Sequence, residues 1–139
     1  PLAIATNEPD YGAFLNWLHF GEATLTFPQT LVLRYSQLEP EERRNPQVAT
    51  DYAKWFHGRL RGIEAALADR EVLCGGRFTV ADVSVGYALL LASRIGLAKD
   101  FTPNVADYWQ RLQKRDGYRR AVEAENLASD RQGVPRRAY

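Results

Sequence analysis

The sequence is poor in several residue types on which whole classes of proteins depend. Of its 139 residues only Cys74 is a cysteine, and a disulfide needs two. A chain of this length buries about two-thirds of the surface that it exposes when unfolded, so one hydrophobic core suffices without a disulfide or a structural metal. A lone cysteine fits a reducing compartment. We therefore expect one domain in the cytoplasm.

The chain also lacks an excess of charge of either sign and any long uncharged run. It has 18 Lys and Arg residues against 17 Asp and Glu residues, whereas phosphate binding requires a clear basic excess. Its longest uncharged stretches are 11–21, 23–33 and 83–93, well short of the roughly 18 residues that span a bilayer. The first ten residues have neither the basic start nor the apolar run of a signal peptide. We expect neither a nucleic-acid nor a membrane partner.

Catalytic and metal-binding motifs are missing from the sequence. It contains no glycine-rich phosphate loop and no serine in a strand-to-helix elbow. His19 and His57 are the only histidines, and neither has a second metal ligand at a helical offset. Cys74, in VLCGG, has no nearby base, so we expect a small core residue rather than a nucleophile. The sequence predicts no catalytic residue, no metal and no resident cofactor.

What the chain does contain is apolar residues at helical spacing along nearly its whole length, with no run that alternates as a strand does. The pattern predicts an all-α bundle of about five helices, at about 10–35, 48–68, 79–93, 103–114 and 117–126. Pro28 lies inside the first of these, which predicts a kink near Phe27. Residues 36–46, SQLEPEERRNP, are expected to form a solvated loop or a short helical turn.

Two predicted helices have clear buried stripes. The second is expected to bury Val48, Tyr52, Trp55, Phe56, Leu60, Ile63 and Leu67. The fourth is expected to bury Val105, Tyr108, Trp109 and Leu112.

The third predicted helix has the strongest start signal. Thr79 fits the N-cap, whose hydroxyl accepts a backbone N–H, and Asp82 at the third helical position accepts the N–H of the cap itself. No charge follows Asp82 within this helix, so it is expected in the middle of the bundle. Thr102 before Pro103, and Asp116, are the predicted N-caps of the last two helices.

One helix face near the N-terminus combines groups that a ligand site needs. Within and just after WLHFGE, residues 17–22, the side chains of His19, Glu22 and Ala23 share a face, with Thr26 one turn on. A carboxylate, an imidazole and small residues beside aromatic rings suit an organic ligand with a cationic end. The same residues also fit a solvated face with an i,i+3 pair, and residue types alone leave both open. The arginines near the C-terminus are expected to be solvated; they are Arg119, Arg120, Arg131, Arg136 and Arg137.

Several motifs resemble the C-terminal all-helical domain of cytosolic glutathione transferases. These are GGRFTVADVSVGY at 75–87, PNV at 103–105 and YWQRL at 108–112, while WLHFGE at 17–22 looks like the first helix of that domain in bacterial and fungal members. The resemblance covers about Pro9 to Ala124. It implies an interdomain linker at 1–9, the helical domain at 10–126 and a C-terminal tail at 127–139.

The resemblance also implies a site. In that family the first two helices form the dimer face and one wall of the pocket for an apolar electrophile. The candidate lining residues here are Phe14, Trp17, His19, Phe20, Ala23, Thr26 and Phe27. In several classes a carboxylate of this helix reaches across the homodimer to the amino group of glutathione, and Glu22 is the nearest match, although its position relative to Trp17 differs from that in some classes. Thr79 and Asp82 are implied to be a structural cap.

This sequence departs from the family pattern at its start. The family's N-terminal thioredoxin-like domain, which activates the thiol of the co-substrate glutathione, has no counterpart here, because only about nine residues precede the matching region. The resemblance therefore implies the electrophile-binding and dimerisation half of a detoxifying glutathione transferase, inactive by itself. A different class stays open, because similar helical domains also serve as non-catalytic protein-interaction modules. A smaller departure is Asp116, where the family often has a proline.

Overall fold

The computed structural model describes residues 1–136, and all regular structure in this range is helical. The α-helices are α1 (Tyr11–His19), α2 (Phe27–Leu33), α3 (Pro46–Ala66), α4 (Val80–Arg94), α5 (Pro103–Gln113) and α6 (Asp116–Gln132). The shorter segments are the π-helices η1 (Phe20–Thr26) and η2 (Arg34–Leu38) and the 3₁₀-helices η3 (Glu41–Arg43) and η4 (Ala98–Asp100). No helix in this range combines the length and the apolarity that crossing a membrane requires.

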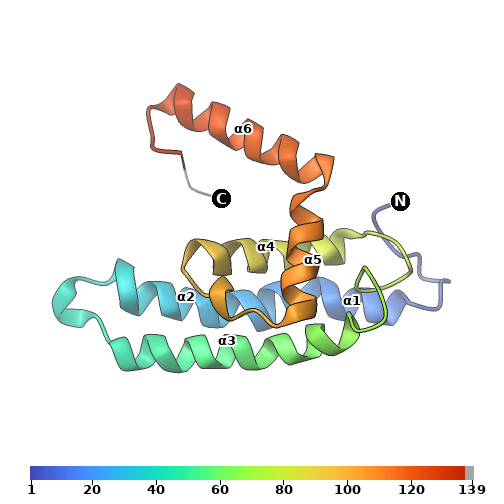
Figure 1. The fold of residues 1–139 in the computed structure, drawn as a ribbon, viewed down its shortest axis with the longest axis horizontal. Coiled ribbons are helices and arrows are strands. Elements are labelled where there is room, and N and C mark those ends of the chain that lie inside the picture. The colour runs from blue at the N-terminus through green and yellow to red at the C-terminus, as the bar shows by residue number, and fades with distance from the viewer. Residues whose placement is uncertain (137–139) are drawn as a thin grey trace.

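The first four segments, α1, η1, α2 and η2, follow one another without a break and form one rod, residues 11–38, which we call the N-terminal rod (Figure 1). If the rod is counted as one helix, the described residues form five helices, namely the rod, α3, α4, α5 and α6, besides the two short 3₁₀-helices. The predicted all-α fold is confirmed. The predicted short helical turn after the rod is η3.

The N-terminal rod is not a uniform α-helix. The N–H of Phe27 donates to the carbonyl of Glu22, five residues back, which is the wide-turn pattern of a π-helix. Pro28 has no N–H to donate, so the continuous rod lacks a backbone hydrogen bond at this residue. The sequence predicted a kink near Phe27, whereas the structure has a π-helical segment just before the proline.

Helix α3 lies along the N-terminal rod and packs against α2 (Figure 1). It begins slightly earlier than predicted, because Asn45 is its N-cap: the side-chain oxygen accepts the N–H of Val48 at 3.1 Å. Pro46 then occupies the first turn. Most of the predicted stripe is buried, namely Phe56, Leu60, Ile63 and Leu67.

The predicted capping box at the start of α4 is confirmed. The N–H of Ala81 donates to the Thr79 hydroxyl at 3.2 Å, and the N–H of Thr79 donates to the Asp82 carboxylate at 2.8 Å. Neither Thr79 nor Asp82 is exposed to solvent. The second carboxylate oxygen of Asp82 accepts the N–H of Leu73 at 3.1 Å and the hydroxyl of Tyr108 at 2.8 Å. One carboxylate therefore joins the preceding loop, the start of α4 and the middle of α5.

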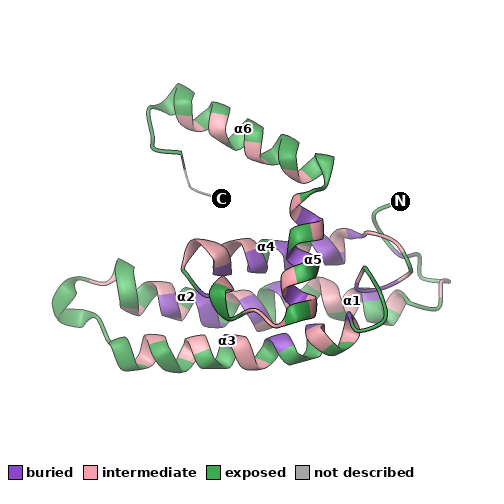
Figure 2. Cartoon of the chain, viewed as in Figure 1, coloured by how far each residue is buried: buried purple, intermediate pink, exposed green. Residues whose placement is uncertain are grey.

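Helix α4 contacts α1, η1 and α5, as expected of a central helix. Its residues Val85, Ala88, Leu89 and Ala92 are all at 0% exposure. One side of α4 is nevertheless open to solvent, because Val83 and Tyr87 are 50% and 59% exposed. Figure 2 shows the buried residues gathered where the N-terminal rod, α3, α4 and α5 meet.

Helix α5 buries the whole predicted stripe: Val105, Tyr108, Trp109 and Leu112. Its N-cap residue is Thr102, but the Thr102 side chain makes no capping hydrogen bond, so that part of the prediction is wrong. The cap comes from α3 instead. The Glu64 carboxylate accepts the N–H groups of Asn104 and Val105 at 3.3 and 3.2 Å.

Helix α6 differs most from the prediction. Asp116 is its first residue rather than its cap, and the N-cap, Arg115, makes no side-chain capping bond. The helix continues past the predicted end at 126 to Gln132, where Gly133 ends it in the left-handed conformation at φ 63°. It has no buried residue and projects from the bundle (Figures 1 and 2). Residues 137–139 of the predicted tail, with Arg137, lie outside the described residues.

The N-terminal residues 1–10 are packed against the start of α4. Ile4 is 2% exposed, and the N–H of Val80 donates to the carbonyl of Leu2 at 2.8 Å. The guanidinium of Arg77 donates to Glu8 at 2.9 Å, and the N–H of Gly75 donates to Asp10 at 2.7 Å. Whatever its role in a longer protein, the predicted linker is an integral part of this fold.

Candidate functional site

The residues predicted to line a pocket lie along α1, η1 and the first turn of α2. Phe14 is only 5% exposed and packs with Ile4, Cys74 and Ala81. Little of its side chain is therefore left for a ligand. Trp17 and Phe20 are half-buried, with their rings in edge-to-face contact at 5.2 Å between centroids.

The polar part of the predicted site is open to solvent. His19, Glu22 and Ala23 are all exposed. Within residues 1–136 no ion pair joins His19 to Glu22, so the i,i+3 pair considered from the sequence does not form. Thr26 is half-buried, and its hydroxyl donates to the carbonyl of Gly21 at 2.9 Å. Glu22 thus presents an uncompensated carboxylate beside the Trp17–Phe20 pair.

The crossing of the N-terminal rod and α4 holds this face in place. The Ser84 hydroxyl donates to the carbonyl of Leu18 at 2.7 Å. The buried Gln29 amide donates to the carbonyls of Leu25 and Ala88, both at 3.0 Å. Gly21 permits the close approach, because a Cβ there would collide with Ser84. The π-helical segment that carries Glu22 and Ala23 is therefore pinned to the central helix.

An exposed aromatic cluster follows on from this face. Phe27 is 51% exposed, and its ring meets those of Tyr52 and Trp55 edge to face, at 6.5 and 6.3 Å. Tyr52 and Trp55 stack at 5.3 Å, and the Arg59 guanidinium lies 5.7 Å from the Trp55 ring centre. The sequence predicted burial for Trp55, which is 43% exposed. Its spacing matched the buried stripe, and nothing in the sequence distinguished it.

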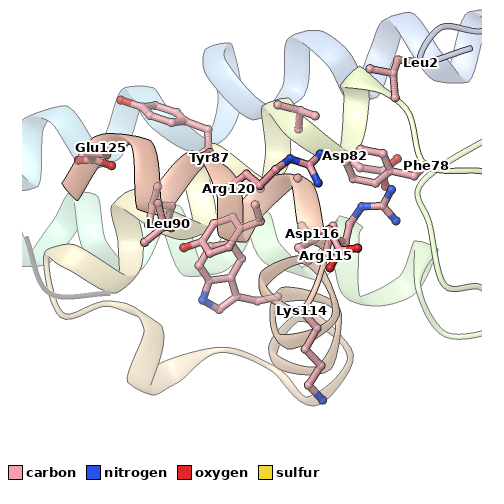
Figure 3. Close-up of a pocket in the computed structure, with 18 residues that line it drawn as sticks. Leu2, Phe78, Asp82, Tyr87, Leu90, Lys114, Arg115, Asp116, Arg120 and Glu125 are labelled. Carbon is pink, nitrogen blue, oxygen red and sulfur yellow. The ribbon is translucent and has the colours of Figure 1, made fainter. Parts of the chain in front are cut away.

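A further cleft lies elsewhere, between α4 and α6. It encloses about 940 Å³, a size typical of small-molecule sites. Tyr87 and Leu90 of α4 line it (Figure 3). Val83 of α4, Trp109 of α5 and Tyr118 of α6 also line it. This cleft was not predicted from the sequence, because a cleft of this kind depends on how far α6 lies from α4.

The remaining reactive groups are structural. Burial raises the pKa of the Cys74 thiol, which keeps it protonated at neutral pH. His57 Nε2 lies 3.0 Å from the carbonyl of Leu97, a contact that joins α3 to the turn after α4. No group of three or more His, Cys, Asp or Glu residues that could hold a metal occurs within residues 1–136.

Sequence comparison finds a curated relative of the chain. No protein-family model matches it. Over 110 residues, or 79% of its length, it is 31% identical to the glutathione S-transferase GstA of Escherichia coli O157:H7. The chain is homologous to glutathione S-transferases. It spans 48% of GstA, so about half the length of this curated relative.

Solved glutathione transferases have the same helical fold. URE2P5 from Phanerochaete chrysosporium matches with a TM-score of 0.80 at 21% identity, over 95% of this chain and 61% of that one. The structure of Ure2p5 cocrystallised with 1-(S-glutathionyl)-2,4-dinitrobenzene matches with a TM-score of 0.78 at 21% identity, over 91% and 61%. BphK, a bacterial glutathione transferase, gives 0.76 at 18% identity, over 90% and 59%. At these identities the likeness establishes the fold.

Proposed function

We propose that this chain is the C-terminal, electrophile-binding and dimer-forming part of a glutathione transferase. The observation that carries the proposal is the 31% identity to GstA over 110 residues. In the proposed reaction the glutathione thiolate forms a bond from sulfur to an electrophilic carbon, and the leaving group departs with its electron pair. The proposed role is detoxification in the cytoplasm.

The electrophile site in this proposal is the face formed by His19, Ala23 and Thr26, with the Trp17–Phe20 pair at its edge. Aromatic rings bind flat apolar molecules through area burial and edge or stacking contacts. Holding the electrophile near the thiolate converts a bimolecular encounter into an oriented one. Phe14 contributes by supporting the helix from the core side, because it is buried behind this face.

Glu22 is the proposed contact for glutathione. Its side chain is exposed and forms no ion pair within the described residues, so its carboxylate is available to the ammonium group of the tripeptide. In the proposed homodimer this glutathione is bound by the partner subunit. A charge-assisted hydrogen bond of this kind contributes about 1.5–3 kcal/mol.

The chain alone is proposed to be inactive, because thiol activation requires a group that lowers the pKa of the glutathione sulfur. The first experiment incubates the purified 139-residue chain with glutathione and 1-chloro-2,4-dinitrobenzene and follows the conjugate by absorbance. We expect the uncatalysed rate. A rate that rises in proportion to chain concentration and saturates with glutathione contradicts the proposal that the chain alone is inactive.

The second experiment uses the longer protein that contains this chain. Glu22→Gln is expected to raise the KM for glutathione about tenfold with kcat nearly unchanged, because it removes binding common to ground and transition states. Glu42→Gln, at another exposed acid, is the matched control and is expected to leave KM unchanged. Equal KM values for the parent and Glu22→Gln remove Glu22 from the site.

The non-catalytic interaction module is the second candidate, and the exposed aromatic cluster of Phe27, Tyr52 and Trp55 favours it. Clustered exposed aromatic residues are typical of protein interfaces. The same cluster lies on the helices proposed for dimerisation, so glutathione binding discriminates the two candidates. A longer protein that binds no glutathione in calorimetry supports the module and contradicts the enzyme.

A further inference from the structure

We propose that residues 1–10 form a clasp that opens as one unit while the helical bundle stays folded, and that its opening uncovers Cys74. We call this segment the N-terminal clasp. The proposal does not depend on the transferase proposal, since it invokes neither glutathione nor an electrophile. The clasp contains no helix or strand, and Ile4 is its one buried residue. A segment with so little buried apolar surface opens at a lower free energy than a helical core does.

Hydrogen bonds attach both ends of the N-terminal clasp to the residues around the start of α4. Near the first end, the N–H of Val80 donates to the carbonyl of Leu2 at 2.8 Å. At the other end, the N–H of Gly75 donates to the carboxylate of Asp10 at 2.7 Å. Both N–H groups lose these partners when the clasp leaves, so their hydrogen exchange reports its opening.

Arg77 attaches the middle of the clasp. Its guanidinium donates to the carbonyl of Ala3 at 3.1 Å and to the carboxylate of Glu8 at 2.9 Å. The same Glu8 oxygen accepts the N–H of Ala5 at 2.6 Å, which ties the clasp to itself. The Arg77 and Glu8 side chains are 34% and 36% exposed, and an ion pair this accessible contributes little. Arg77 therefore fixes where the clasp docks more than it adds to the cost of opening.

Ile4 is the apolar anchor of the clasp. It is 2% exposed and packs in one cluster with Phe14, Cys74 and Ala81. Gly75 permits this packing, because a Cβ there would collide with the Ile4 side chain. The other members of the cluster belong to α1, to α4 and to the loop before α4, so they stay in the bundle when the clasp opens. Withdrawal of Ile4 therefore uncovers Cys74 and removes one packing partner of Phe14.

The first test uses Cys74 as the reporter, because it is the only thiol in the chain. Its thiolate attacks 5,5′-dithiobis(2-nitrobenzoate) when the reagent reaches it. A mixed disulfide forms, and 2-nitro-5-thiobenzoate leaves with its electron pair and is followed by absorbance. Ile4→Val shortens the anchor and is expected to speed this reaction about two- to tenfold. An unchanged rate means that Ile4 does not cover the thiol, and it contradicts the proposal.

Ile63→Val is the matched control, since Ile63 of α3 is at 0% exposure in the other buried cluster. The same substitution there weakens the core but leaves the clasp in place. The thiol of this variant is therefore expected to react at the rate of the parent. Circular dichroism confirms that both variants fold. If the two variants speed the reaction equally, the reagent reaches Cys74 only through unfolding of the bundle, and the proposal is wrong.

The second test asks whether the clasp opens as one unit. The N–H groups of Gly75 and Val80 donate to the clasp. Those of Leu73 and Thr79, close by in the sequence, donate instead to Asp82 in the bundle, at 3.1 and 2.8 Å. Hydrogen exchange of single amides, followed by NMR, measures each group separately. In the parent we expect Gly75 and Val80 to be less protected than Leu73 and Thr79.

Ile4→Val is expected to speed exchange at Gly75 and Val80 by the same factor, about two- to tenfold. Exchange at Leu73 and Thr79 is expected to stay as in the parent, because their acceptor lies in the bundle. Faster exchange at only one end of the clasp shows that the segment frays rather than opens as a unit. Faster exchange at all four groups shows that the bundle unfolds with it. Either result overturns the proposal.

Discussion

At the residue scale, one buried and one half-buried carboxylate, Asp82 and Glu64, connect helices that lie far apart in the sequence. Asp82 accepts hydrogen bonds from Leu73, Thr79 and Tyr108. Burial, together with the Asp82 carboxylate, raises the pKa of the Tyr108 hydroxyl well above its usual range, so the phenol stays protonated and donates. Glu64 connects α3 to α5 by accepting hydrogen bonds from the N–H groups of Asn104 and Val105.

Glu64 also makes the stability of the fold depend on pH. Burial acts to raise the pKa of Glu64, but the hydrogen bonds that it accepts outweigh burial and hold the pKa below its ordinary value of 4.5. A depressed folded-state pKa means that the stabilisation is complete well above pH 4.5 and is lost as the pH falls through the folded value. Urea unfolding from pH 7 to pH 3 measures the loss.

We expect Glu64→Gln to lower the free energy of unfolding by about 1 kcal/mol at pH 7, as loss of a helix cap typically does. The difference from the parent is expected to shrink as the pH falls through the lowered pKa of Glu64, because the parent carboxylate then becomes protonated. Glu123→Gln, at an exposed site on α6, serves as the control with no difference at either pH. If the free energies of unfolding of the parent and Glu64→Gln change with pH in parallel, Glu64 is not the source of the pH dependence.

The caps formed by Asp82 and Glu64 differ in whether they could be predicted from the sequence. Thr79 and Asp82 are three residues apart, so their reciprocal cap is a local pattern and was predicted. Glu64 and Val105 are 41 residues apart, and their contact exists only once α3 and α5 have packed. Thr102 fitted the local rule for an N-cap equally well, but the Glu64 carboxylate caps α5 instead of the Thr102 side chain.

At the scale of elements, η1 and α4 cross in close contact at Gly21 and Ser84. Gly21→Ala is expected to lower the free energy of unfolding by about 1–3 kcal/mol, as overpacking typically does, because the new methyl meets both the side chain and the backbone of Ser84. Gly62→Ala in α3, where nothing lies within 4 Å of the new methyl, is expected to stabilise by up to about 1 kcal/mol through helix propensity.

Denaturant unfolding of the two alanine variants beside the parent distinguishes close packing from a general preference for alanine. If Gly21→Ala is as stable as the parent, the rod and α4 separate easily at this point. In that case the Glu22 face is not held by the central helix.

Helical periodicity predicted the existence of every major helix but not all of their details. The stripe of α5 was predicted completely, because it faces the core along its whole length. The π-helical segment before Pro28 and the six-residue continuation of α6 past Asn126 were not, because neither depends on apolar spacing. The candidate face at His19 and Glu22 could be found from residue types, whereas the cleft lined by α6 could not.

At the scale of the whole molecule, α6 is fastened by few contacts. The Arg94–Glu125 pair at 3.2 Å and the Trp109–Tyr118 ring contact are among them, and no residue of α6 is buried. Elements with little buried apolar surface open at low free energy. We expect hydrogen exchange in peptides from 116–132 to be about a hundredfold less protected than in peptides from 80–94. Equal protection of the two segments shows instead that α6 unfolds only with the core.

The pinning of the N-terminal rod to α4 has a consequence for synthesis. The hydrogen-bond partners of Leu18 and Gln29 lie about sixty residues downstream, at Ser84 and Ala88. A ribosome adds about 5–20 residues per second, so the rod emerges roughly 3–13 seconds before the helix that covers its apolar side. During that interval Phe14 and Leu25, which end up at 5% and 0% exposure, are available to chaperones and to neighbouring nascent chains.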